Sequence, residues 1–185
     1  MCRREKKTKT EEKEKQEEKR ANWKKKIDRL PPSKRILLKR SFGTMINDAD
    51  VSTMSVFYGL FPEISEREES RCFAAACCHC LWDVNDGPAI PMEEAIGRML
   101  RTSATASDSL KKRVWKMLDT RWDESGYLLT QISRMIKLLK AKGYVIDSYS
   151  LYGDLMNWDR DRRTVQKKWI NIIIINDKGG MEDVD

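Results

Sequence analysis

The chain has 185 residues, of which 40% are hydrophobic, and it carries a formal net charge of +7. This apolar fraction supports a folded core and excludes a wholly disordered chain, and the length allows one domain or two small ones. The longest unbroken apolar run, residues 72–78, is far shorter than the roughly 20 residues that span a bilayer, so no membrane partner is predicted. The charged start also lacks the apolar stretch of a secretory signal, which predicts a cytoplasmic protein.

The first part of the chain is a charged arm, assigned to residues 1–30. Residues 1–26 hold 12 Lys or Arg and 6 Glu, and they are polar on every side. The arm is therefore predicted to be a frayed helix or a disordered segment that buries almost nothing, and a simple solubilising tail is the plainest interpretation. The rest of the chain is nearly neutral, so any phosphate-binding surface there requires segregated charge.

Proline residues end the arm and open the folded body. Pro31 and Pro32 stop a preceding helix, and Ser33 is predicted to cap a helix over residues 34–42. The same reasoning from caps and breakers predicts further helices over residues 51–61 and from residue 66 through residue 82, and a short helix that has Pro91 as an early residue.

An uncharged segment of small residues, 102–107, is the predicted boundary between two bundles. Beyond it, helices are predicted over residues 110–120, 127–142, 148–158 and 164–175. The β-branched residues 172–175 could form a strand, but no second strand-like segment exists to pair with them. The predicted fold class is all-α: a charged N-terminal extension, helical bundles over residues 31–104 and 105–176, and a flexible acidic tail over residues 177–185.

Crowded cysteines between residues 72 and 80, together with His79, raise the question of a metal site. They lie within one apolar helical run, where adjacent side chains diverge by about 100°, so buried core residues are the preferred interpretation. His79 is the only histidine, and no glycine-rich phosphate loop is present. The sequence predicts no enzyme, no metal, no cofactor and no small-molecule substrate.

Basic residues carry the stronger functional signal. Arg134, Lys137 and Lys140 recur at i, i+3 and i+6, opposite the apolar stripe of Leu128, Ile132, Met135 and Leu139. Further basic clusters occur at residues 39–40, 111–113 and 160–168. A surface made from several of these would follow a sugar-phosphate backbone, although solvated outer faces are the alternative interpretation.

Several short motifs, in this order, carry a family resemblance. They are residues 38–43 (LKRSFG), 57–62 (FYGLFP), 113–115 (RVW), 136–143 (IKLLKAKG), 154–155 with Trp158, and 165–169 (VQKKW). Together they resemble the CasB family, the small subunit of the type I-E CRISPR surveillance complex Cascade. The resemblance spans about residues 34–176; the arm lies outside it, and Trp115 stands where the family usually has Phe.

The resemblance implies a non-catalytic helical subunit that stabilises the R-loop of guide RNA and target DNA in antiviral defence. The implied partners are other Cascade subunits, a second copy of the chain, the CRISPR guide RNA and the target DNA. Motif positions carry over as backbone contacts at Lys39, Arg40, Lys112, Arg113, Lys137, Arg162 and Arg163, whereas Arg134 and Lys140 rest on the helical face alone. The competing hypothesis is a helical adaptor that binds only protein.

Overall fold

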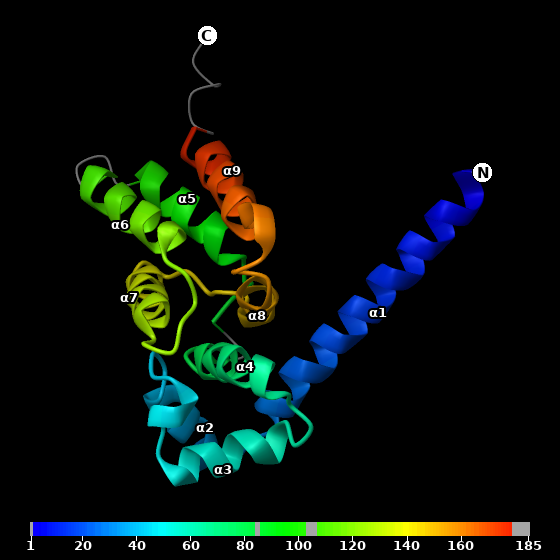
Figure 1. Cartoon of the computed structure of the whole chain (residues 1–185), viewed down its shortest axis with the longest axis vertical. Helices are drawn as coiled ribbons and strands as arrows, with labels where there is room; N and C mark the ends of the chain where they lie inside the picture. The colour runs from blue at the N-terminus through cyan, green and yellow to red at the C-terminus, as the bar shows by residue number, and fades with distance from the viewer. Residues whose placement is uncertain (1, 84–85, 103–106, 179–185) are drawn as a thin grey trace.

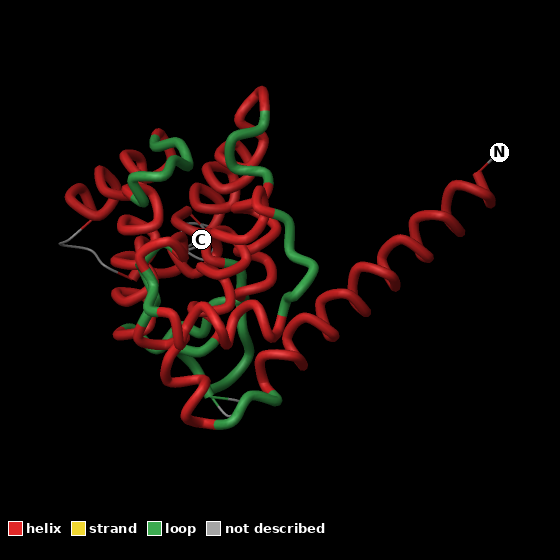
Figure 2. The backbone as a smooth tube through the Cα atoms, turned by 60° about the horizontal axis from the view of Figure 1, so that its bottom comes forward, coloured by secondary structure: helices red, strands yellow, loops and turns green. Residues whose placement is uncertain are grey.

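The structure of the protein is a computed structural model that describes residues 2–83, 86–102 and 107–178. Over these residues it contains nine α-helices and two short 3-10 helices, and no strand, so the predicted all-α class is confirmed (Figures 1 and 2). An isolated parallel bridge joins Ile90 to Ile146. None of the described helices combines the length and the apolar character that crossing a membrane requires.

The helices closely match the segments predicted from caps and breakers. They are α1 (Cys2–Asp28), α2 (Pro32–Arg40), α3 (Val51–Leu60), α4 (Glu66–His79), α5 (Met92–Thr102), α6 (Ser107–Asp119), α7 (Tyr127–Ala141), α8 (Ser148–Met156) and α9 (Thr164–Lys178). The N-cap of α2 is Pro31 and not Ser33, so the helix begins at Pro32. A proline fits this first position because the first backbone N–H of a helix has no partner within the helix. The β-branched residues near the end of α9 are helical, as predicted.

One continuous hydrophobic core runs through the body. α4 lies at its centre, where the apolar segment from Cys72 to Cys78 is buried throughout, which confirms the interpretation of the cysteines as core residues. α4 packs against α8 and α2, while α5 packs along α9 (Figure 1). The core therefore joins the first helices of the chain to the last.

The packing of α5 bears on how the chain is divided. The sequence analysis placed residues 92–102 in the N-terminal bundle, yet α5 contacts α9, α7 and α6, all from the second half. The division at residues 104 and 105 stays a prediction, because residues 103–106 lie outside the described ranges. Most of the predicted acidic tail, from residue 179 onward, also lies outside them.

The expectation that residues 1–26 bury almost nothing is wrong at Trp23. Its side chain is 8% exposed, and Ile27, one turn further on, is fully buried. Trp23 stacks on Tyr152 at 6.1 Å between ring centroids, and its indole N–H donates to the Cys72 sulfur at 3.5 Å. Residues four apart share a helix face, so these two apolar residues anchor the end of a helix that is otherwise polar.

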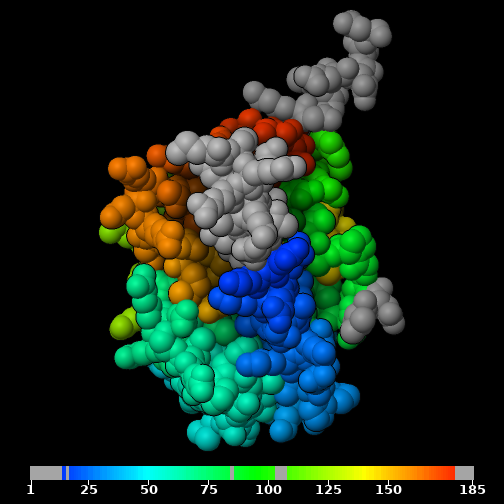
Figure 3. All heavy atoms as spheres, turned by 90° about the vertical axis from the view of Figure 1, so that its right-hand side faces the viewer, coloured from blue at the N-terminus to red at the C-terminus, as the bar shows by residue number. Residues whose placement is uncertain are grey.

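Ionic contacts reinforce this docking at the base of α1. Arg20 and Lys24 both pair with the Asp147 carboxylate, whose side chain is 4% exposed; the Lys24 ammonium lies 2.9 Å away. Figure 3 shows the inner end of α1 lying against the body, where the helix contacts α4 and α8. In Figures 1 and 2 the rest of the helix leads away from the body. α1 is thus a docked helix with a projecting end.

His79 of α4 provides a pH-dependent part of the same contact. Its Nε2 lies 2.9 Å from an Asp28 carboxylate oxygen and its Nδ1 lies 2.8 Å from the Ser148 hydroxyl. Burial lowers the pKa of His79 below its ordinary value of 6.5, outweighing the Asp28 carboxylate, and the cations of Arg35 and Lys24 act in the same direction as burial. The folded protein therefore favours the neutral imidazole.

A depressed histidine pKa predicts a loss of stability in acid. The contribution of the neutral His79 to the stability of the fold is complete above pH 6.5. It is lost as the pH falls through the lowered pKa of the folded state, because the unfolded chain binds the proton more readily. We expect the free energy of unfolding of the wild type, relative to His79→Gln, to decrease between about pH 7.5 and about pH 5. Urea denaturation at both pH values measures it; a difference independent of pH would contradict the assignment.

Candidate nucleic-acid interface

The groove between α6 and α7 collects basic side chains from both helices. It has a volume of about 450 Å³, and its cationic lining consists of Arg113, Lys116 and Arg134. α7 presents Arg134 because its apolar stripe is buried in the core, as the periodicity predicted. The Lys116 ammonium lies 5.6 Å from the Tyr127 ring centroid. The structure thus brings together two residues predicted on separate grounds, Arg113 from a motif and Arg134 from the helical face.

The exposed ridge of α7 continues this surface. Arg134 and Lys137 are exposed, and within the described ranges neither side chain has a hydrogen-bond or ion-pair partner. Lys140 differs, because its ammonium donates to the Leu81 carbonyl and lies 5.2 Å from the Trp82 ring centroid. Lys140 therefore stabilises the end of α4 as well as adding charge to the ridge.

Lys39 and Arg40 stand at the end of α2, and both are exposed. The turn that follows them lies against α7: Gly43 has a φ of +97°, and a Cβ atom there would lie 2.8 Å from the Ser133 hydroxyl. Ser133 precedes Arg134 in the chain, so the close approach brings the end of α2 to the basic ridge. Any larger residue at position 43 would crowd the Ser133 side chain and have to adopt a left-handed backbone.

Lys112 lies on the outer side of α6, exposed to solvent. Beside it, Trp115 is 36% exposed and lines a second groove of about 310 Å³, between α6 and α9. Lys167 and Arg163 of the α9 region also line this groove. The solvent-facing surface of α6 therefore has a groove on each side: a basic one shared with α7, and a mainly apolar one, with Lys167 in its lining, shared with α9.

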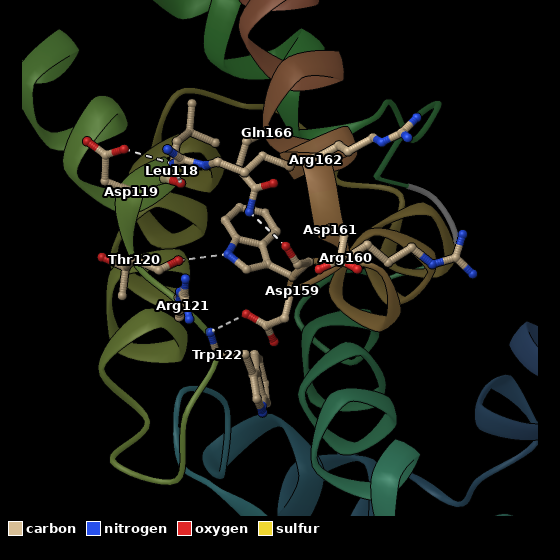
Figure 4. A pocket seen from close by; sticks show the side chains of 12 residues that line it. Leu118, Asp119, Thr120, Arg121, Trp122, Asp159, Arg160, Asp161, Arg162 and Gln166 are labelled. Atoms are coloured by element: carbon tan, nitrogen blue, oxygen red, sulfur yellow. Dashed lines mark hydrogen bonds and ion pairs between the residues drawn. The ribbon is translucent and has the colours of Figure 1, made fainter.

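Arg162 and Arg163 line a neighbouring pocket of about 670 Å³, shown in Figure 4, which shares Arg163 with the groove between α6 and α9. Arg121, on the loop after α6, and Arg160, in the turn between α8 and α9, also line it. Arg163 donates to the Leu118 carbonyl and the Asp119 carboxylate, both at 2.8 Å, so part of its function is to close the end of α6. The cations predicted from the sequence thus lie on two surfaces: the α2, α6 and α7 face, and this arginine pocket.

Three lining residues were missed by the sequence analysis. Lys116 follows Arg113 by one helical turn, a spacing that could have indicated it. Arg121 and Gln166 had no such signal, because they reach the pocket only where the loop after α6 meets the start of α9. Such long-range contacts have no counterpart in local periodicity.

Comparison with known proteins gives consistent matches. A family model described as CRISPR-associated protein Cse2 matches residues 35–171. The fold is similar to a chain of a "CRISPR RNA-guided surveillance complex", with a TM-score of 0.68 and 16% identity, covering 86% of this chain and 92% of that one. It is also similar to the crystal structure of M. ruber CasB, with a TM-score of 0.63 and 21% identity, covering 80% and 87%. No curated protein matches the chain.

Proposed function

Because the chain belongs to the CRISPR-associated Cse2 family, we propose that it is a non-catalytic, nucleic-acid-binding small subunit of a type I-E Cascade complex. In this role it contacts the backbones of the guide RNA–target DNA R-loop during antiviral defence, alongside other Cascade subunits and a second copy of itself. The observation that carries the proposal is the row of exposed cations on α6 and α7, of which Arg113, Arg134 and Lys137 have no side-chain partner among the described residues.

Unpaired cations of this kind suit a phosphate backbone. They can contact phosphates of any sequence, which fixes the position of a strand without reading its bases. Exchange of a DNA duplex for an RNA–DNA hybrid is close to balanced in free energy, so modest backbone contacts can favour the R-loop. The groove between α6 and α7 holds cations on both sides, which suits a strand lying along it.

The chemistry of the nucleophilic side chains supports a non-catalytic role. Burial raises the pKa of Cys72 and of Cys80 to about 11, so both thiols are protonated at neutral pH. His79 is half-buried in the contact between α4 and α1, where both ring nitrogens have partners. These groups serve the core and the docking of α1.

A matched pair of variants tests the proposal. Arg134→Ala/Lys137→Ala removes two ridge cations, while Lys34→Ala/Arg67→Ala removes the same charge from exposed positions on α2 and α4. Both variants should fold, because exposed substitutions change stability by less than about 0.5 kcal/mol. Lys140 is left intact because it binds the Leu81 carbonyl.

The readout is the salt dependence of binding to single-stranded DNA. Loss of two phosphate contacts should make the logarithmic salt slope shallower by about 1.4 in the ridge variant, for two unrelated strands alike, and leave the control unchanged. Fluorescence anisotropy at several salt concentrations measures this. Equal slopes in both variants would remove the ridge from the interface, and a wild type that binds no strand would favour a protein-binding adaptor.

A further inference from the structure

We propose that the pocket in Figure 4 binds one unpaired nucleotide of a single strand, with its phosphate at the arginine rim and its base inside, next to Gln166. The inference rests on the proposed function, since it presumes that the protein binds nucleic acid. It adds a discrete site, between the loop after α6 and the turn that joins α8 to α9, on a different part of the chain from the α7 ridge.

Gln166 is the observation that points to a ligand. Its side chain is buried, with the residue only 5% exposed, and its amide N–H donates to the Trp158 carbonyl at 2.8 Å. This bond fixes the orientation of the amide and leaves its carbonyl oxygen without a partner among the described residues. A buried acceptor without a partner costs about 1–3 kcal/mol. A ligand with an N–H group would satisfy it, and every nucleobase offers a ring or exocyclic N–H donor.

The rim supplies charge for the phosphate. Arg121, Arg160 and Arg162 have no ion pair or side-chain hydrogen bond within the described part of the chain. In Figure 4 the side chains of Arg160 and Arg162 extend outward from the pocket, where they could meet a backbone that passes the opening. Guanidinium groups bind phosphate oxygens in a two-pronged geometry, so this arrangement favours a nucleotide over a neutral ligand.

Backbone geometry at the rim is also unusual. Arg162 and Arg163 have φ values of 69° and 53°, in the left-handed region that favours glycine. Two successive residues of this kind are costly and occur most often where a functional surface requires them. Their conformation separates the two side chains: Arg163 turns back onto Asp119, whereas Arg162 stays at the opening.

The pocket's carboxylates do not cancel this charge. Asp119 is paired with Arg163, and Asp159 accepts from the backbone N–H of Trp122 and from Arg71. Only Asp161 is left to oppose the three free arginines. A volume of about 670 Å³ lies within the usual range for small-ligand sites. A base enters a pocket of this kind only after it leaves its stack and its pairing partner, which restricts the ligand to single strands.

Indole N–H signals provide a direct probe of the pocket. Trp122 and Trp158 line it, whereas Trp23 lies in the docking site of α1. Titration of the full chain with deoxycytidine monophosphate, followed by nitrogen–proton correlation spectra, is expected to shift the Trp122 and Trp158 signals and leave the Trp23 signal in place. Inorganic phosphate should produce smaller shifts. Equal shifts by both ligands, or shifts reproduced by polyglutamate, would overturn the assignment to a nucleotide.

Variants connect the pocket to strand binding. Arg160→Gln/Arg162→Gly removes two rim cations, and glycine accepts the φ of 69° at position 162, so the fold is retained. The variant should bind a single-stranded 20-mer on the order of tenfold more weakly than wild type, through loss of charge-assisted bonds. An abasic strand should bind the wild type more weakly than the intact strand, and this difference should vanish in the variant.

The outcomes separate the two proposals. If Arg134→Ala/Lys137→Ala changes the salt slope while the pocket variant retains the wild-type preference for intact strands, the pocket assignment fails and the proposed function stands. If the wild type binds no strand, both fail. A third outcome is that the wild type binds intact and abasic strands equally well and that the pocket variant binds both more weakly by the same factor. The site would then contact phosphate only, and the proposed place of the base would be overturned.

Discussion

Replacing Trp23 with alanine is expected to lower the free energy of unfolding by about 3–5 kcal/mol, the usual cost of removing a buried aromatic side chain. Trp23 contacts rings from three other helices or their ends: Phe61 at the end of α3, His79 of α4, and Tyr149 and Tyr152 of α8. The surrounding rings are held in place by their own packing, so they cannot move in to fill the cavity that the substitution leaves.

The matched control for this substitution is Asn22→Ala. Asn22 is the preceding residue of α1 and is exposed, so its replacement should change stability by less than about 0.5 kcal/mol. Urea denaturation followed by circular dichroism measures both variants. Equal and small effects would mean that α1 does not dock in solution, and the arm would then be the solubilising tail that composition alone suggested.

Replacing Lys168 with methionine is expected to cost about 2–3 kcal/mol at neutral pH. The Lys168 ammonium lies 3.0 Å from a Glu93 carboxylate oxygen and 2.7 Å from one of Asp154, and it joins α5, α8 and α9. Trp169 also donates to Asp154, at 2.8 Å. Methionine keeps the apolar stem but leaves two shielded carboxylates without their cation. The estimate lies below the usual cost of breaking a fully buried pair because the lysine side chain is 41% exposed.

The pH dependence of this loss gives a second check. Burial raises the pKa of Glu93 even with Lys168 beside it, so folding favours the protonated carboxyl. The stability of the protein therefore falls as the pH rises through the pKa that Glu93 has in the folded state. Without the ammonium this pKa should rise further, so the defect of Lys168→Met should shrink toward about pH 4. Lys167→Met, at the exposed neighbouring position, serves as control and should be near neutral. A defect that is the same at both pH values would exclude Glu93 from the effect.

The sequence predicted those parts of the fold that repeat locally. In α7, Leu128, Ile132, Met135 and Leu139 are all buried, because their spacing follows the helical period. Cap and breaker residues located most helix ends within a few residues, since such signals are also local.

Contacts between segments that are distant in the sequence could not be predicted from these local patterns. Trp23 stood in a run of lysines, and its partners at residues 61, 79, 149 and 152 come from separate elements. Lys140 and Arg163 were predicted as nucleic-acid contacts, and the structure shows that each also binds a backbone carbonyl, of Leu81 and Leu118 respectively. Sequence shows where a charge lies on its own helix, while the neighbouring carbonyl depends on the tertiary fold. Whether the remaining cations contact nucleic acid stays a prediction.

The packing of α5 along α9 also sets an order of events during synthesis. Ribosomes release a chain from its N-terminus, so α5 emerges with its apolar face, including Ile96 and Met99, long before α9 exists to cover it. The contact spans much of the chain, and such non-local contacts form slowly. The nascent protein therefore holds part of the α5 apolar face uncovered until α9 has been synthesised, which exposes this stage to aggregation and to capture by chaperones.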